Sequence, residues 1–158
     1  MKKIIALLLT LATVFAFVAC NNAKNDEGAS AGSAAKESVT IVEYVADGED
    51  IEYTVDLSAL ESKTAFAALN YLKTEKGVKF EYSDSQYGAL VSAFGSLTTD
   101  YDAKRSVYFW TSVQSDWDVS AYATEKTYKD TKLVSSGEGV STMKVEDKAI
   151  IYVGYTTW

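Results

Sequence analysis

The chain has 158 residues, with 22 acidic and 15 basic side chains, no histidine and a single cysteine. A formal net charge of −7 argues against binding to nucleic acid and against docking on anionic membranes through basic residues. Without histidine, and with one cysteine, the chain lacks the commonest general bases, thiol nucleophiles and transition-metal ligands. We therefore expect a protein that is not an enzyme and requires no cofactor.

The first nineteen residues have the layout of a secretory signal peptide. Two lysines precede an apolar run, Ile4–Val18, which is shorter than the roughly 20 residues that a membrane-spanning helix needs. The stretch FVAC, which ends at Cys20, resembles a bacterial lipobox, in which the cysteine is lipidated and becomes the first residue of the mature protein. The alternative is a secreted protein with a free thiol. The expectation is an extracytoplasmic protein anchored to a bacterial membrane by lipid on Cys20.

Residues 20–37 are small and polar after the cysteine, with no large apolar side chain, which is typical of a flexible tether. Residues 38–158 are long enough for one domain with a hydrophobic core. Within them, Ser38–Ala46 and Ile51–Leu57 alternate between apolar and polar residues and predict two strands. Because Asp47-Gly48 is a favourable turn, we expect these strands to form a hairpin.

Apolar residues recur at helical spacing in Ser58–Lys76, which predicts a helix that stops at Gly77. Val78–Tyr82 predicts the next strand. The stretch SQYGALVSAFG, residues 85–95, does not alternate, and we interpret it as a glycine-permitted turn that leads into a strand buried on both faces.

Two further strands are predicted near the end of the chain, Ser106–Val113 and Lys148–Tyr155. The polar stretch between them, Gln114–Lys144, is too long for a hairpin loop. It either contains short strands or serves as a functional excursion, that is, a long loop that leaves the sheet and returns to it. This order of elements predicts an α+β fold, β-grasp-like, with one main helix packed on a mainly antiparallel or mixed sheet.

Acidic residues are the remaining candidates for chemistry. Paired carboxylates suit glycoside hydrolysis only when they face each other across a cleft, so solvated turns explain these pairs better. The pairs are Glu49/Asp50, Asp100/Asp102 and Asp116/Asp118. The residues from Asp116 to Ser120 place oxygen ligands at alternate positions, as calcium prefers, but the glycine and glutamate that complete an EF-hand loop are missing. We therefore predict no metal site.

Aromatic residues are in surplus, with 11 tyrosines and 3 tryptophans. In the strand SVYFWTSV, Tyr108 and Trp110 share one face and Phe109 takes the other. Two readings follow from bulky residues on both faces. One is a second core layer, and the other is an aromatic platform for a flat or sugar-like ligand.

The segments KTAFAALNYLKTEKGVKFEY, SQYGALVSAFG, SVYFWTSV and EDKAIIYVGY together resemble the C-terminal β-domain of transcobalamin and intrinsic factor, which also occurs in short bacterial surface lipoproteins. The matching positions are Thr64, Tyr87-Gly88, Tyr108 and Tyr155. The resemblance covers Val39 to Tyr155 and implies a transcobalamin-like domain over residues 38–158. It does not include the large helical part that forms the other half of the carriers' cobalamin site.

In those carriers, the aromatic-glycine turn, the aromatic strand and the following loop face the corrin ring. By position, the resemblance nominates Tyr87, Gly88, Trp110 and Trp117 as ligand-binding residues. It implies a non-enzymatic surface module that binds cobalamin or a related corrinoid, with a membrane transporter as a partner. The alternative, from a different class, is an adhesion module that meets a surface protein or glycan.

Overall fold

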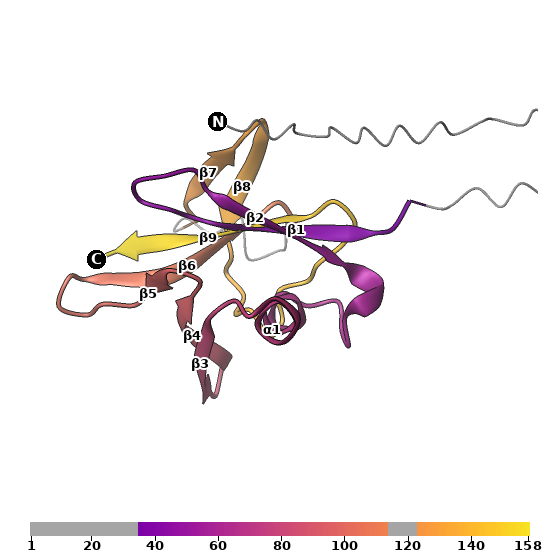
Figure 1. The fold of residues 1–158 in the computed structure, drawn as a ribbon. Helices are drawn as coiled ribbons and strands as arrows, with labels where there is room; N and C mark the ends of the chain where they lie inside the picture. The colour runs from indigo at the N-terminus through magenta and orange to yellow at the C-terminus, as the bar shows by residue number, and fades with distance from the viewer. Residues whose placement is uncertain (1–34, 114–122) are drawn as a thin grey trace, which may run out of the picture. The chain divides into compact units, whose positions relative to one another are not determined.

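In the computed structural model, which describes residues 35–113 and 123–158, the chain folds as an α-helix, a short 3-10 helix and two β-sheets (Figure 1). These residues belong to one compact unit, Ala34–Trp158. The elements are β1 Ser38–Glu43, β2 Ile51–Asp56, η1 Leu57–Ala59, α1 Ala65–Lys76, β3 Phe80–Ser85, β4 Gly88–Phe94, β5 Leu97–Thr98, β6 Arg105–Thr111, β7 Glu125–Tyr128, β8 Thr131–Ser135 and β9 Ile150–Thr157.

The larger sheet has six strands in the order β2-β1-β9-β6-β8-β7. β9 lies between β1, to which it is parallel, and β6, to which it is antiparallel. Apolar residues meet across both ladders, where Ile151 is level with Ile41 and Val153 with Phe109. The last strand is therefore the centre of the sheet, and two segments far apart in the sequence are joined through it.

The six-stranded sheet is curled, as contacts between side chains of its two edge strands show. The hydroxyl of Tyr128 on β7 donates a hydrogen bond of 2.8 Å to Glu52 on β2. Lys129, in the turn after β7, forms an ion pair of 2.6 Å with the same carboxylate. Exposed ion pairs of this kind stabilise a fold only slightly, so they mark the curl rather than cause it.

The smaller sheet has three strands in the order β3-β4-β5 and lies with α1 on one side of the larger sheet (Figure 1). The helix begins at Ala65 because the side chain of Thr64 accepts a hydrogen bond from the Ala67 amide, and it ends at Gly77 in the left-handed conformation. Its buried face consists of alanines and leucines, among them Leu69 and Leu72.

Two apolar clusters lie on opposite faces of the larger sheet. The main cluster joins α1 and the smaller sheet to residues such as Ile41, Val107 and Phe109. The second cluster consists of Val42, Trp110, Leu133 and Tyr152, with Tyr44, Tyr108, Tyr128 and Ile150 packed against it. The predicted alternation in β6 is thus confirmed, since Phe109 and Trp110 enter different clusters.

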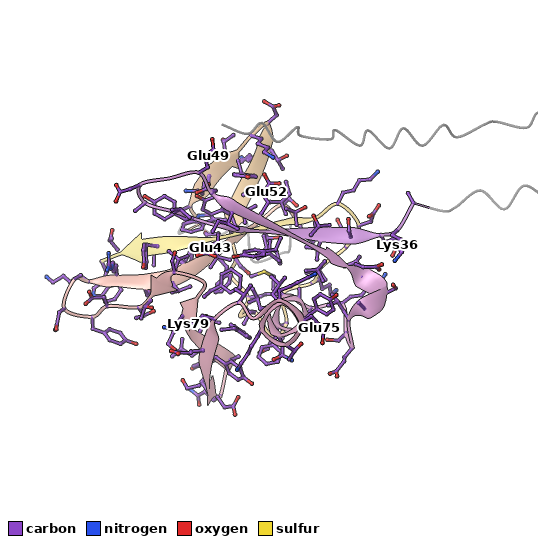
Figure 2. The ribbon with its side chains drawn as sticks, in the orientation of Figure 1. Lys36, Glu43, Glu49, Glu52, Glu75 and Lys79 are labelled. Carbon is purple, nitrogen blue, oxygen red and sulfur yellow. The ribbon has the colours of Figure 1, made fainter. Side chains whose placement is uncertain are left out.

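Glu43 connects the two sheets through a buried carboxylate. It projects from β1 toward the smaller sheet and is only 2% exposed (Figure 2). Its oxygens accept hydrogen bonds from the Ser96 amide at 2.6 Å, the Ser96 hydroxyl at 2.7 Å and the Tyr53 hydroxyl at 2.8 Å. Among the described residues no lysine or arginine forms an ion pair with it. Hydrogen bonds to the turn between β4 and β5 therefore replace its hydration.

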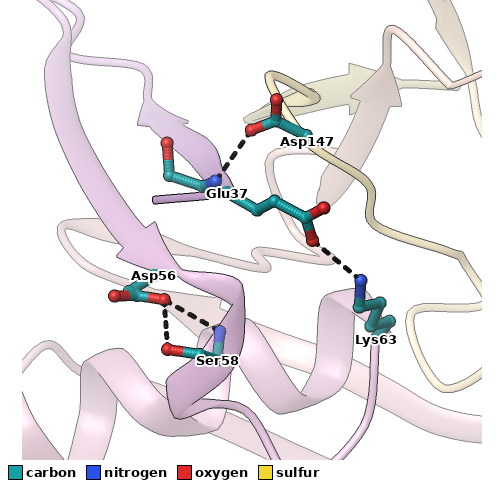
Figure 3. Close-up of polar contacts among 6 residues, drawn as sticks. Glu37, Asp56, Ser58, Lys63 and Asp147 are labelled. Carbon is teal, nitrogen blue, oxygen red and sulfur yellow. Dashed lines mark hydrogen bonds and ion pairs between the residues drawn. The ribbon is translucent and has the colours of Figure 1, made fainter. Parts of the chain in front are cut away.

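A set of exposed polar contacts fixes the start of β1 (Figure 3). The Ser38 amide donates to Asp147, in the segment before β9, at 3.0 Å, and Lys63 pairs with Glu37 at 3.0 Å. Asp56 accepts hydrogen bonds from both the amide and the hydroxyl of Ser58. These bonds, with the neighbouring lysine, lower the pKa of Asp56 to about 2.

The α+β prediction is confirmed, with one main helix on a mixed sheet; the β-grasp-like arrangement stays a prediction. The hairpin of β1 and β2 is where the sequence predicts it. The predicted helix begins later, at Ala65, because η1 and the Thr64 cap precede it. The long excursion contains the short strands β7 and β8.

The prediction that residues 85–95 feed a strand buried on both faces is wrong. β4 pairs within the smaller sheet, where one face packs on the core and the other faces solvent. Leu90 is consequently 59% exposed while Phe94 is fully buried. The turn itself is as expected, since Gly88 has a φ of 94°.

We predict that Gly95→Ala strongly destabilises the protein. Gly95 has a φ of 56°, and a β-carbon there would overlap the carboxylate of Glu43. Left-handed strain and overpacking together suggest a loss of about 2 to 5 kcal/mol in the free energy of unfolding, measurable by urea denaturation. Gly77→Ala is the matched control, because its φ is 69° but no atom lies within 4 Å of the added carbon. An equal loss in both variants would contradict the role assigned to Glu43.

We also predict that stability falls in alkaline solution partly through Tyr53. Burial, followed by the hydrogen bond to Glu43, raises the pKa of Tyr53 to about 12. The folded state thus holds this proton more tightly than the unfolded chain, whose tyrosines titrate near pH 10. The associated stability is fully present below about pH 10 and is lost as the pH rises toward about 12. Tyr53→Phe should make the decline shallower in denaturation curves recorded across this range; an unchanged slope would refute the assignment.

Candidate functional site

An apolar groove lies between the smaller sheet, β6 and the segment that follows β8. We call it the hairpin groove, because the hairpin of β3 and β4 forms one wall. Its volume is about 170 Å³. The lining residues are Ala89, Leu90, Val91, Val107, Tyr108, Phe109, Ser136, Glu138, Gly139 and Val140.

Hydrogen bonds hold the two walls of the hairpin groove together. The amide of Ala89 donates to the hydroxyl of Ser141 at 2.9 Å, which links β4 to a residue 52 positions later. The Ser136 amide donates to the Phe109 carbonyl at 3.0 Å, which ties the far wall to β6. A β-carbon on Gly88 would lie 2.8 Å from the Ser141 hydroxyl oxygen, so only glycine permits this close approach.

The hairpin that walls the groove carries exposed side chains: Leu90 lines the groove, and Tyr87 lies in the adjoining turn, whose backbone comes close to Gly139. Tyr87, in the turn between β3 and β4, is 81% exposed, and Leu90 is 59% exposed. The turn is itself ordered, since Ser85 accepts from the Tyr87 amide at 3.1 Å and donates to the Gly88 carbonyl at 2.7 Å. A rigid turn therefore presents a free aromatic ring next to an apolar groove, which is a combination suited to binding.

The chemistry that the groove offers is recognition. Its walls are apolar, and Glu138 is the ionisable side chain among its lining residues apart from the tyrosine. In the described part of the chain, the groups with shifted pKa values all lie elsewhere, and each shift follows from a structural hydrogen bond or from burial. An arrangement of this kind can bind an apolar or aromatic surface and orient it.

Trp110 lies in the second cluster, away from the hairpin groove. It is 8% exposed, and its indole nitrogen donates to the Thr124 hydroxyl at 3.1 Å. Its ring packs edge to face with Tyr108 at 5.1 Å and with Tyr152 at 6.3 Å. The structure therefore gives Trp110 the role of a second core layer and does not bring it together with Tyr87 and Gly88.

A lysine closes this aromatic cluster. The ammonium of Lys126 lies 4.2 Å from the centre of the Tyr152 ring and 5.5 Å from that of Trp110. The Tyr152 hydroxyl donates to Asp50 at 2.9 Å, and burial and this bond raise its pKa above the ordinary value. Cation–π contact and these hydrogen bonds satisfy the polar edges of the cluster.

Three other expectations concern residues outside the described ranges. These are the lipid on Cys20, the ligand contact of Trp117 and the absence of a calcium site around Asp116. Within 35–113 and 123–158 there is no group of three or more histidine, cysteine or acidic residues placed to hold a metal ion. The described helices include none that is long and apolar enough to cross a membrane.

Sequence reasoning missed Leu90, Val140 and Ser141. The sequence pattern places Leu90 in a strand buried on both faces, and it places Val140 and Ser141 in the long polar stretch Gln114–Lys144 without any role. No short stretch of the sequence indicates that these residues lie together, because Ser141 meets β4 only through the tertiary fold. The exposed pair formed by Tyr87 and Leu90 is recognisable once β4 is known to have a solvent face.

No protein-family model matches the sequence, and no curated protein is significantly similar to it. Solved structures share its fold, among them the following two. A proposed metal-binding protein from Ruminococcus gnavus aligns with a TM-score of 0.52 and 9% identity, over 78% of this chain and 99% of that one. Haptocorrin in complex with Cbi aligns with a TM-score of 0.53 and 8% identity, over 78% of this chain and 26% of that one. At such identities the similarity shows a distant fold relationship and nothing more.

We predict that Ser141→Ala loosens the hairpin groove without unfolding the domain. The variant leaves the part-buried amide of Ala89 without its acceptor, which typically costs about 1 to 3 kcal/mol. Hydrogen exchange at the Ala89 amide should accelerate, and the free energy of unfolding should decrease by about 1 to 3 kcal/mol. Ser83→Ala, on the exposed face of β3, is the control and should leave both quantities unchanged. Unaltered exchange at Ala89 in Ser141→Ala would show that this bond does not hold the groove.

Proposed function

We propose that this protein is a non-enzymatic ligand-binding module, held outside a bacterial cell by lipid on Cys20. Its hairpin groove would contribute one side of a site for a corrinoid or a similarly flat ligand. The observation that carries the proposal is the ring of Tyr87, 81% exposed on an ordered turn beside an apolar groove. The fold shared with haptocorrin supports the choice of ligand class.

The size of the groove limits what it does alone. Pockets that enclose a small molecule usually measure about 300 to 1,000 Å³. The hairpin groove, at about 170 Å³, is smaller, and the match to haptocorrin spans 26% of that chain. We infer that the groove receives one face or edge of the ligand and that a partner, such as a membrane transporter, covers the rest. Affinity of the isolated domain is then expected to be modest.

The test is calorimetric titration of the purified chain with cobinamide and with cobalamin. We expect binding in the micromolar range and a loss of about tenfold in Tyr87→Ala, because an exposed aromatic anchor is removed. Tyr101→Ala is the matched control, since that tyrosine is 72% exposed but lies in the loop between β5 and β6 and not in the hairpin that walls the groove. No heat at high micromolar ligand would overturn the corrinoid proposal. Trp110→Ala is unsuitable, because truncating a buried tryptophan costs about 3 to 5 kcal/mol.

A second candidate function is protein interaction through β3. This strand is an edge of the smaller sheet, and its residues from Glu81 to Ser85 are exposed. An exposed edge can accept an extended segment of another protein. A surface protein that is retained by the wild type and released by a β3 peptide would favour this function over corrinoid binding.

The topology also supports the β-grasp-like assignment as a proposal. A hairpin is followed by a helix, and the last strand returns beside the first strand and parallel to it. The smaller sheet and the hairpin of β7 and β8 are then additions to that arrangement.

A further inference from the structure

The loop between β5 and β6 lies beside the end of β9 (Figure 1). A second concave surface is formed at this loop. It is a hollow of about 470 Å³, within the range of small-molecule pockets. Its lining residues are Thr98, Thr99, Asp100, Tyr101, Asp102 and Arg105. We call this surface, together with Trp158, the aromatic corner.

Two aromatic side chains stand exposed beside each other at the aromatic corner. Tyr101 is 72% exposed and Trp158 is 61% exposed. Their ring centres are 6.2 Å apart and their planes are tilted by 56°. Tyrosine and tryptophan are enriched at binding surfaces, where they supply a large apolar area with little conformational freedom.

Backbone hydrogen bonds order the two segments that carry the rings before any ligand arrives. Asp100 and Arg105 exchange two backbone hydrogen bonds, of 2.9 and 3.0 Å, which close the loop that carries Tyr101. The amide of Trp158 donates to the Lys104 carbonyl at 3.3 Å, which ties the end of β9 to the same loop. The Ala103 amide donates a hydrogen bond to the Asp100 carboxylate at 3.0 Å, which tightens the turn. Preorganisation of this kind reduces the entropy lost on binding.

Polar groups of both signs surround the rings. The carboxylate of Asp100 lies 3.7 Å from the guanidinium of Arg105, which in turn lies over the ring of Tyr155 at 4.8 Å. Asp102 and Lys104, both exposed, add one further charge of each sign. Because the charges balance, the corner favours a neutral ligand that both donates and accepts hydrogen bonds.

We propose that the aromatic corner binds a neutral carbohydrate. The apolar faces of sugar rings would pack on Tyr101 and Trp158, while Asp100, Asp102 and Arg105 would bond to hydroxyl groups. The tilt between the rings distinguishes this ligand from a flat one, since one plane cannot lie on both rings, whereas successive sugars of an oligosaccharide can each meet one. The site is separate from the hairpin groove and does not depend on the function proposed for it.

The test is affinity electrophoresis of the full chain in gels that contain neutral β-1,3-glucan, β-1,4-glucan, mannan or galactan, followed by calorimetry with the matching oligosaccharide. We expect retardation by at least one of these polymers. Tyr101→Ala and Trp158→Ala should each weaken binding by about tenfold, and Asp102→Asn by about three- to tenfold. These side chains are exposed, so thermal unfolding should be unchanged.

Tyr87→Ala is the control for the corner and should bind the polysaccharide as the wild type does, just as Tyr101→Ala should keep its affinity for cobinamide. Absence of retardation in all four gels would overturn the proposal. Wild-type retardation in both Tyr101→Ala and Trp158→Ala would overturn it equally. Binding of tetramethylammonium at the corner without binding of any sugar would show that the site takes organic cations instead.

Discussion

The buried carboxylate of Glu43 is the interaction on which the arrangement of this domain depends. Removing an ionised group from water is costly unless hydrogen bonds replace its hydration. The donors are the amide and hydroxyl of Ser96 and the phenol of Tyr53. Tyr53 belongs to the larger sheet, but both bonds from Ser96 form only when the smaller sheet is docked on the larger one. The position of β4, and with it the hairpin groove, follows from this requirement. The glycine next to Ser96 leaves room for the carboxylate.

The two faces of the larger sheet are covered by different parts of the chain. One face carries α1 and the smaller sheet, and the hairpin groove opens at its margin. The other face is filled by the cluster around Trp110 and Tyr152, which Lys126 covers. The most conspicuous aromatic residues of the sequence therefore build structure, whereas Tyr87, Tyr101 and Trp158 remain available for contact with other molecules.

Local patterns predict much of this fold but little of its candidate sites. The hairpin of β1 and β2, the helix that ends at Gly77 and the alternation of Phe109 with Trp110 all follow from periodicity, and periodicity is a property of neighbours in the chain. The exposure of Leu90 depends on which sheet β4 joins, and the pairing of Ser141 with β4 depends on how loops far apart in the sequence meet. Such facts arise from tertiary packing, which leaves no trace in a short window of sequence.

The central position of β9 in the larger sheet has a consequence for how the protein folds during synthesis. Ribosomes make the chain from its N-terminus, so β1 and β6 exist well before the strand that must separate them. Until Ile150–Thr157 is available, the apolar edges of both strands lack their partner, and direct pairing of β1 with β6 would be a wrong but accessible product. Correct folding of the larger sheet thus has to wait until β9 has been made, and a chain without this strand would lose the whole sheet rather than one edge of it.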